Sequence, residues 1–221
     1  MKNKTRRFRS VLCCTGMITI LCVQTAMAQS AVLLVPETHT EEGSGPGAET
    51  EQIGTTRIQA VVKAVGDGEI LVESQTEEPY QGEMLLHTSV FDTRFVNGET
   101  GFQAEPASLQ AGDTIYADIR TMMAESLPPQ VTAEVIICNM PEGACAPEYL
   151  LTESMEWQED GSWRLVSSSG AVYQIPGDCP VNSYGMNQPA SFRIISKSSK
   201  LLIWMDESSR PQRILKLPAR W

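Results

Sequence analysis

Residues 112–137 combine a turn, an alternating stretch, a proline-rich corner and a second alternating stretch. Alternation of apolar and polar side chains is typical of a strand with one buried face. Pro128 and Pro129 fix two backbone angles and remove two amide donors, so no helix or sheet ladder runs through the corner. A shorter version of this pattern returns near the C-terminus, with residues 203–206 standing for 115–118 and residues 211–212 for 129–130. These matches predict that the chain contains two copies of one small β unit.

The rest of the chain repeats an order of short strands and tight turns. Asp67-Gly68 in the first copy matches Asp160-Gly161 in the second. Helical periodicity is nearly absent, and short strands at this spacing are typical of small barrels. We therefore predict an all-β fold of two tandem small antiparallel β-barrels, both OB-like, at residues 53–140 and 148–219. The expected strands are residues 57–65, 69–74, 82–88, 93–96, 114–120 and 131–137, then 151–157, 163–168, 171–176 and 201–206.

The N-terminus has the three parts of a secretory signal peptide. Five basic residues and no acid accompany an apolar stretch at residues 11–23, and Ala26-Met27-Ala28 supplies the small residues of a cleavage site. We predict that residues 1–28 are removed and that the mature chain begins at Gln29 without a transmembrane segment. Residues 29–52 are acidic and contain Gly, Ser and Pro, a composition that predicts a flexible leader.

Removal of the signal peptide makes an acidic chain more acidic. The full chain has 17 Lys and Arg against 27 Asp and Glu, and its net charge is −10. Without the five basic residues of the signal peptide, the net charge becomes −15. Such a surface repels a phosphate backbone, so nucleic acid is not an expected partner. A cell-surface polymer or a protein is expected instead, with the chain in the cell envelope or outside the cell.

Three cysteines, Cys138, Cys145 and Cys179, remain after the signal peptide is removed. Outside the cytoplasm a disulfide is allowed between Cys138 and Cys145 or between Cys145 and Cys179, and the spacing does not choose between them. Sulfur atoms are also soft metal ligands, but the chain lacks a Cys-x-x-Cys pair, so a disulfide or free thiols are favoured over a metal site. We predict no metal and no cofactor.

Aromatic side chains gather in the second copy and form its candidate ligand-binding residues. Aromatic surface on a barrel can stack against sugars or peptides, but large aromatics also fill small cores. The sequence favours the core interpretation for Trp163 and Trp204. The candidate residues are Trp157, Trp163, Tyr173 and Trp204.

Catalytic signals are weak. His87 is the only histidine in the expected folded part, with Ser89 and Asp92 near it in the sequence. A Ser/His/Asp relay needs an activated serine beside the histidine, and the chain has no Gly-x-Ser-x-Gly elbow. We therefore predict that the protein is not an enzyme and has no catalytic residue.

The pattern Pro-x-x-Leu-x-x-Gly-Asp-x-Ile at residues 106–115, followed by Ser-x-Pro-Pro-Gln-x-Thr-Ala at residues 126–133, resembles secreted proteins of Gram-positive anaerobes. Those proteins carry a duplicated β-rich module without an established activity, often beside copper-amine-oxidase-N-terminal-like stalk domains. The resemblance covers about residues 53–217 and departs at Lys200, where the second copy is expected to have Gly-Asp. It implies a β fold and an exported location.

These observations predict a non-catalytic exported protein that acts as a binding or scaffolding module at the cell surface or outside the cell. The alternative is a carbohydrate- or peptide-binding module that uses the aromatic residues of the second copy. A small hydrolase is a third candidate, and the missing nucleophile motif disfavours it.

Overall fold

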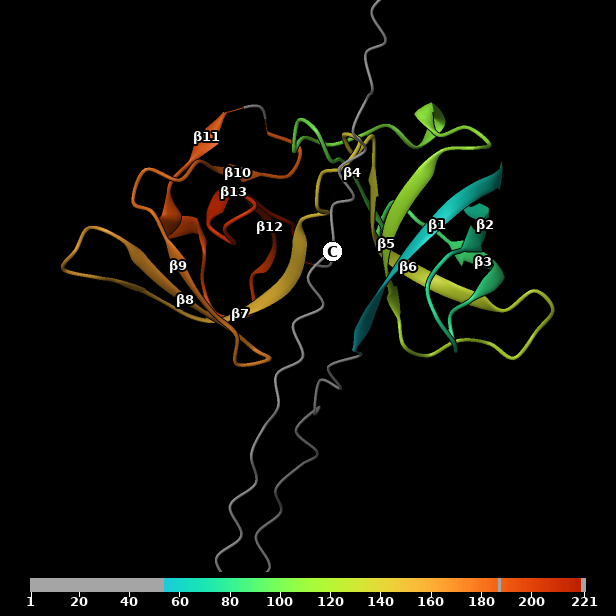
Figure 1. Cartoon of the computed structure of the whole chain (residues 1–221), viewed down its shortest axis with the longest axis horizontal. Coiled ribbons are helices and arrows are strands. Elements are labelled where there is room, and N and C mark those ends of the chain that lie inside the picture. Colours follow the sequence, from blue (N-terminus) through green and yellow to red (C-terminus); the bar gives the residue numbers. More distant parts are fainter. Residues whose placement is uncertain (1–53, 187, 220–221) are drawn as a thin grey trace, which may run out of the picture. The chain divides into compact units, whose positions relative to one another are not determined.

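A computed structural model describes residues 54–186 and 188–219. The expected signal peptide at residues 1–28 and leader at residues 29–52 lie outside this part. The fold is all-β, with two sheets and two short 3₁₀ turns, η1 (Pro106–Ser108) and η2 (Phe192–Ile194) (Figure 1). Within these residues no helix is long and apolar enough to cross a membrane.

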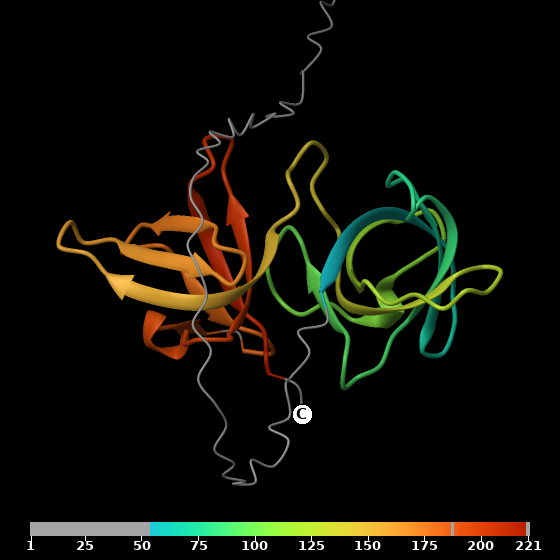
Figure 2. The same ribbon diagram turned by 90° about the horizontal axis from the view of Figure 1, so that it is seen from below.

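The first sheet is a closed barrel of five strands with a sixth strand beside it. Its order is β3-β2-β1-β5-β6, and a parallel pairing of β3 with β6 closes the ring, as the view in Figure 2 shows. β4 pairs in parallel with residues 135–138 of β6, beyond the residues that pair with β3. The strands are β1 (Thr55–Val65), β2 (Glu69–Ser74), β3 (Gly82–His87), β4 (Arg94–Asn97), β5 (Thr114–Arg120) and β6 (Gln130–Cys138).

Alternation along β1 explains how the barrel forms. Ile58, Ala60 and Val62 point into the ring and are almost fully buried, while the residues between them are more exposed. The second half of β1, residues 60–65, pairs with β2, and its first half, residues 55–61, pairs with β5. The barrel interior is filled mainly by aliphatic side chains, so hydrophobic burial is its main source of stability.

The second sheet has seven strands in the order β11-β10-β13-β12-β7-β8-β9. Its pairings are antiparallel except for β10 with β13. The strands are β7 (Glu148–Trp157), β8 (Trp163–Ser167), β9 (Val172–Ile175), β10 (Val181–Ser183), β11 (Pro189–Ala190), β12 (Lys200–Met205) and β13 (Pro211–Lys216).

The two sheets share strand order and irregularities. The order β3-β2-β1-β5-β6-β4 reappears as β9-β8-β7-β12-β13-β10. A bulge lies at Val62 in β1 and at Thr152 in β7. The amide of Gly112 donates to the carbonyl of Val62 at 2.8 Å, and the amide of Ser198 donates to that of Thr152 at 2.7 Å. Gly112 and Ser198 both have positive φ, so they are equivalent positions in one repeated unit.

The match of residues 203–206 with residues 115–118 joins the right pair of strands, β12 and β5, but is two residues out of register. Ile115 follows Gly112 at the same interval as Leu201 follows Ser198, so Ile115 corresponds to Leu201 and not to Ile203. A shift of two residues keeps a side chain on the same face of a strand. The apolar pattern is therefore insensitive to this error.

The Gly-Asp position of the second copy is also found at a different place. The amide of Val62 donates to the carbonyl of Asp113 at 2.8 Å, and that of Thr152 donates to Ser199 at 2.9 Å. Ser198-Ser199 therefore stands where Gly112-Asp113 stands in the first copy. The departure expected at Lys200 is a Gly-Asp to Ser-Ser replacement just before it.

The second sheet lacks the closing pair of the first. A bulge pairs Ile119 of β5 with Ala133 of β6, and the matching bulge pairs Met205 of β12 with Pro211 of β13. Pro211 therefore corresponds to Ala133 and not to Pro129, and β13 begins after the point at which β6 pairs with β3. Within the described residues β9 and β13 form no ladder. The structure has one closed barrel, with a parallel closing pair, where the sequence predicts two antiparallel barrels.

The two sheets pack against each other through a shared apolar cluster. Alternate residues of β6 face the barrel interior or this cluster, and both faces of β12 are likewise covered. Polar contacts reinforce the packing, among them Trp204 to Gly98, Lys200 to Glu134, and Tyr184 to the carbonyl of Phe95. The buried members of the cluster are Val96, Val135, Ile137, Leu202, Trp204, Leu215 and Leu217.

Candidate functional site

Trp204 belongs to the packing between the sheets and lies apart from the other aromatic candidates. Its side chain is 7% exposed, and its indole N–H donates to the carbonyl of Gly98 at 2.8 Å. The guanidinium of Arg213 stacks over the ring at 4.5 Å and also donates to the carbonyl of Glu99 at 3.1 Å. Gly101 leaves room for this guanidinium, because a Cβ there would come within 2.8 Å of it. Trp204 therefore has a structural role.

Trp157 and Trp163 do come together. They face each other across the β7–β8 hairpin, with ring centroids 5.2 Å apart in an edge-to-face arrangement. Trp163 is partly buried and stacks on Phe192 at 5.2 Å, which anchors it to the second core. Trp157 is 57% exposed. The ring of Trp157 is therefore open to solvent and packs against the ring of Trp163.

Tyr173 lies on β9, next to this hairpin. Its hydroxyl donates to the carboxylate of Glu148 at 2.6 Å, and burial together with this hydrogen bond raises the pKa of Tyr173. Tyr173 also lines a pocket of about 400 Å³ between β9 and the turn of residues 206–210. We call this pocket the open seam, because it occupies the gap that the β3–β6 pairing closes in the first barrel. Its lining residues are Ser162, Val172, Tyr173, Gln174, Pro176, Ser209, Arg210 and Pro211.

A turn stabilised by Asp206 forms one wall of the open seam. The Asp206 carboxylate accepts hydrogen bonds from the amides of Ser208 and Arg210 and from the side chain of Gln212. The hydrogen bonds from the Arg210 and Ser208 amides lower the pKa of Asp206. This wall is therefore held in a defined shape by its own hydrogen bonds.

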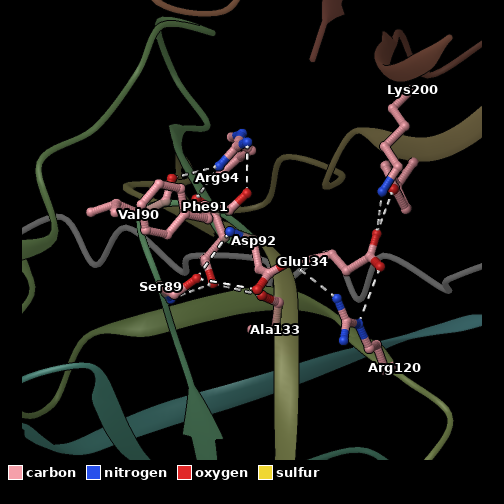
Figure 3. A network of polar contacts seen from close by, with 11 residues as sticks. Ser89, Val90, Phe91, Asp92, Arg94, Arg120, Ala133, Glu134 and Lys200 are labelled. Atoms are coloured by element: carbon pink, nitrogen blue, oxygen red, sulfur yellow. Dashed lines mark hydrogen bonds and ion pairs between the residues drawn. The ribbon is translucent and has the colours of Figure 1, made fainter. Parts of the chain in front are cut away.

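A second, larger pocket of about 800 Å³ lies at one end of the first barrel, bordered by residues 65–68, 88–90 and 103–107 and by Tyr184. Arg94 is the buried cation in its wall. The guanidinium donates to the carbonyls of Val90, Thr93 and Phe91 at 3.0–3.1 Å, and Figure 3 shows it held by its own loop. These bonds give Arg94 a structural task, which is to hold the loop before β4.

The buried polar network between the sheets centres on Glu134 of β6 (Figure 3). Its carboxylate accepts from Lys200 at 2.6 Å, from the hydroxyl of Tyr149 at 3.0 Å and from Arg120 at 3.4 Å. Burial alone would raise the pKa of Glu134, but the hydrogen bonds and positive charges lower it below its ordinary value. Because Lys200 and Tyr149 belong to the second sheet, Glu134 joins the two sheets.

Asp118 and Arg57 form a second buried pair. Arg57 donates to both carboxylate oxygens of Asp118, at 2.6 and 3.0 Å, and also donates to the carbonyl of Pro147. Burial raises the pKa of Asp118, and the charge of Arg57 offsets only part of this effect. The pair fixes the start of the second sheet to β1 and β5.

His87 and Ser89 use their polar atoms in different contacts. The His87 ring contacts the side-chain oxygen of Gln130 at 2.9 Å and lies 3.5 Å from the carboxylate of Glu69. The Ser89 hydroxyl donates to Asp92 at 3.3 Å. Each residue therefore contributes to the local structure of the barrel wall.

The three cysteines are free thiols in this structure. Cys138 lies in the core of the first barrel, and burial raises its pKa. Cys179 lies in the core of the second sheet, where burial raises its pKa to about 11. Cys145 is exposed. The searched part of the chain contains no cluster of three or more His, Cys, Asp and Glu side chains that could hold a metal ion.

Sequence reasoning missed the open seam and the Glu134 network. The seam depends on which strands pair across the barrel, and a sequence pattern does not report long-range pairing. The network had a weak signal, because Glu134 interrupts the apolar run of β6. A charge inside such a run is normally paired when it is buried.

The chain matches no protein-family model. A comparison with curated proteins also gives no match.

Proposed function

We propose that this protein is a non-catalytic exported binding module with two OB-like units, and that its second unit carries the binding face. The five strands β1, β2, β3, β5 and β6 have the order and the parallel closure expected of an OB-type barrel. The second sheet repeats the order without the closure. The resemblance to secreted proteins of Gram-positive anaerobes and the expected signal peptide support export.

The binding face of OB-type barrels lies on strands 2 and 3 and on the loops beside them, where oligosaccharides and oligonucleotides bind. In the second unit these elements are β8, β9 and the turns at residues 158–162 and 206–210. The exposed ring of Trp157, the partly exposed Trp163 and Tyr173 and the open seam all lie there. This coincidence is the observation that carries the proposal.

The acidic composition selects among polymers. A net charge of −10 for the whole chain disfavours a phosphate backbone. A neutral carbohydrate or a peptide segment at the cell surface is therefore the proposed class of ligand, and stacking on Trp157 is the contact common to both.

Binding of the secreted chain to purified cell-wall polysaccharide and to cell-surface protein tests this proposal. The measured mass of the secreted chain should match a chain that begins at Gln29. We expect Trp157→Ala to weaken binding about tenfold, because the exposed ring supplies the stacking contact. Phe91→Ala is the matched control, since Phe91 is an exposed aromatic residue, 66% exposed, in the first unit. Equal loss in both variants, or binding that survives in Trp157→Ala, would contradict the proposal.

A further inference from the structure

The first barrel shows what kind of group fills the position of the open seam. There the chain itself supplies an extended segment, Gln130 to Thr132, which runs parallel to β3. The amide of Leu85 on β3 donates to the carbonyl of Pro129 at 2.8 Å. Val131, the central residue of the segment, is 3% exposed and belongs to the barrel core. A short strand with one buried apolar side chain therefore closes the first barrel.

The second sheet lacks this segment. Because Pro211 corresponds to Ala133, the residues equivalent to 130–132 are Ser208, Ser209 and Arg210. These residues form an exposed turn, in which the polar residue Ser209 corresponds to Val131. The pocket of about 400 Å³ lies at this place, within the range of about 300–1,000 Å³ usual for ligand pockets.

The edge of β9 that faces the seam has backbone groups available for a ladder. Ser167 donates its amide to the carbonyl of Ala171, so Ala171, Tyr173 and Ile175 direct their backbone groups toward β8. By alternation, Val172 and Gln174 direct theirs to the seam. Val172 corresponds to Leu85, whose amide makes the closing bond in the first barrel. Val172 is 53% exposed.

We propose that the open seam binds an extended peptide segment of a partner protein by strand addition, parallel to β9. The peptide has a polar–apolar–polar pattern, and its apolar side chain enters the pocket as Val131 enters the core of the first barrel. Main-chain hydrogen bonds to Val172 and Gln174 give affinity, and the single pocket gives specificity. This inference rests on the proposed function, because it places the ligand on the same face of the second unit.

A peptide is favoured over a sugar at the seam by two features of the structure. The chain fills the equivalent place with its own backbone, so the spacing of donors and acceptors suits an extended polypeptide. The equivalent position in the first barrel is filled by the apolar side chain of Val131, and Val172, Pro176 and Pro211 give the seam an apolar part that suits such a side chain better than a sugar. The exposed Trp157 remains available for a sugar or for a second part of the peptide.

The chain contains its own probe for the test. A capped synthetic peptide with the sequence of residues 126–134, Ser-Leu-Pro-Pro-Gln-Val-Thr-Ala-Glu, reproduces the segment that closes the first barrel. We expect it to cause saturable amide shifts in the isotope-labelled mature chain, concentrated on β9 and the turn of residues 206–210. A peptide with Asp in place of the central Val should bind at least tenfold more weakly, because a charge would enter the pocket.

Two variants isolate the backbone contact. Val172→Pro removes the amide that faces the seam, and Pro is tolerated at this type of position because the β8 ladder does not use that amide. It should weaken peptide binding about tenfold, whereas Phe91→Ala, at an exposed position of the first unit outside the seam, should bind within about twofold of the wild type. If Val172→Pro fails to fold, a peptide N-methylated at the amide that faces β9 replaces it, with methylation of the neighbouring amide as the control.

Absence of saturable shifts at millimolar peptide would overturn the inference, as would shifts confined to β3 and β6, which would indicate exchange in the first barrel. If the free chain dimerises in sedimentation experiments and the amides of β9 are protected from hydrogen exchange, a second copy of the chain occupies the seam. That result would also overturn the inference. Polysaccharide binding that depends on Trp157, without peptide binding, would leave the proposed function standing and remove only this inference.

Discussion

Glu134 is held in its ionised form by Lys200, Tyr149 and Arg120, and its pKa lies below the ordinary value of 4.5. A carboxylate whose pKa is lower in the folded chain than in the unfolded chain stabilises the fold at pH values above 4.5. This contribution is lost as the pH falls through the lowered folded pKa. The charge on Glu134 therefore makes the packing of the two sheets sensitive to acid.

Glu134→Gln should lower the free energy of unfolding at pH 7 by about 1–3 kcal/mol, because Lys200 loses the negative charge that compensates its partly buried ammonium. Urea unfolding at pH 7 and at pH 3 measures the effect, and the difference from the wild type should shrink at pH 3. The control is Glu153→Gln, since the Glu153–Lys197 pair is exposed and should change stability by less than about 1 kcal/mol. A difference that is equal at both pH values would show that Glu134 acts through shape and not through charge.

The pKa of Asp118 is shifted in the opposite direction to that of Glu134. Burial raises its pKa despite the bidentate contact with Arg57. A carboxyl group whose pKa is higher in the folded chain binds its proton more tightly there. Its ionisation therefore lowers the stability of the fold as the pH rises from the unfolded pKa through the folded pKa. As the pH falls, protonation of Asp118 therefore raises the stability of the fold while protonation of Glu134 lowers it. A variant in which only one of the two residues is replaced separates these effects.

At the scale of single elements, the proline corner prepares β6 for its pairing with β3. The Pro129 carbonyl accepts the amide of Leu85, and β6 begins at the next residue. Pro129→Ala should lower the free energy of unfolding by about 0.4–1 kcal/mol, because the unfolded chain gains freedom while the carbonyl contact is kept. Thermal unfolding measures this change. Leu127→Ala is the control, since Leu127 is 99% exposed and should change stability by less than about 0.5 kcal/mol.

Strands with one buried face were predictable, and strands defined by distant pairing were not. The alternation of β1 and β5 is local, so the sequence reports it directly. β10 and β11 have three and two residues, too few for a pattern, and β10 exists because it pairs with β13. β13 starts at Pro211, and the sequence comparison assigns this proline to a corner. The open seam follows from the same nonlocal pairing, so no local signal identified it.

The aromatic candidates divide for a similar reason. Trp204 lies in a run of five apolar residues, Leu201 to Met205, and such a run indicates a strand with both faces covered. That signal was present and points to a structural role. The exposure of Trp157 has no equivalent signal, because it depends on how far the β7–β8 hairpin extends beyond the core. Sequence reasoning could therefore reject one candidate but could not select another.

At the scale of the whole folded part, the shared apolar cluster should make the two sheets unfold together. Leu202 and Val135 lie in this cluster from opposite sheets and are almost fully buried. The Glu134 network adds charge pairing across the same contact. Separation of the sheets would expose apolar surface on both and would leave a buried carboxylate without its cation, so a state with one sheet folded and the other unfolded is costly.

The tryptophans provide a test of this coupling, since the three that the structure describes all lie in the second sheet or its loops. Urea unfolding followed by tryptophan fluorescence reports on that sheet, whereas far-ultraviolet circular dichroism reports on both. The two curves should coincide for the wild type. Leu202→Ala opens a cavity in the shared cluster, so it should cost about 2–5 kcal/mol and separate the curves. Leu165→Ala, within the second core, should shift them together. Two transitions in the wild type would show that the sheets are independent units.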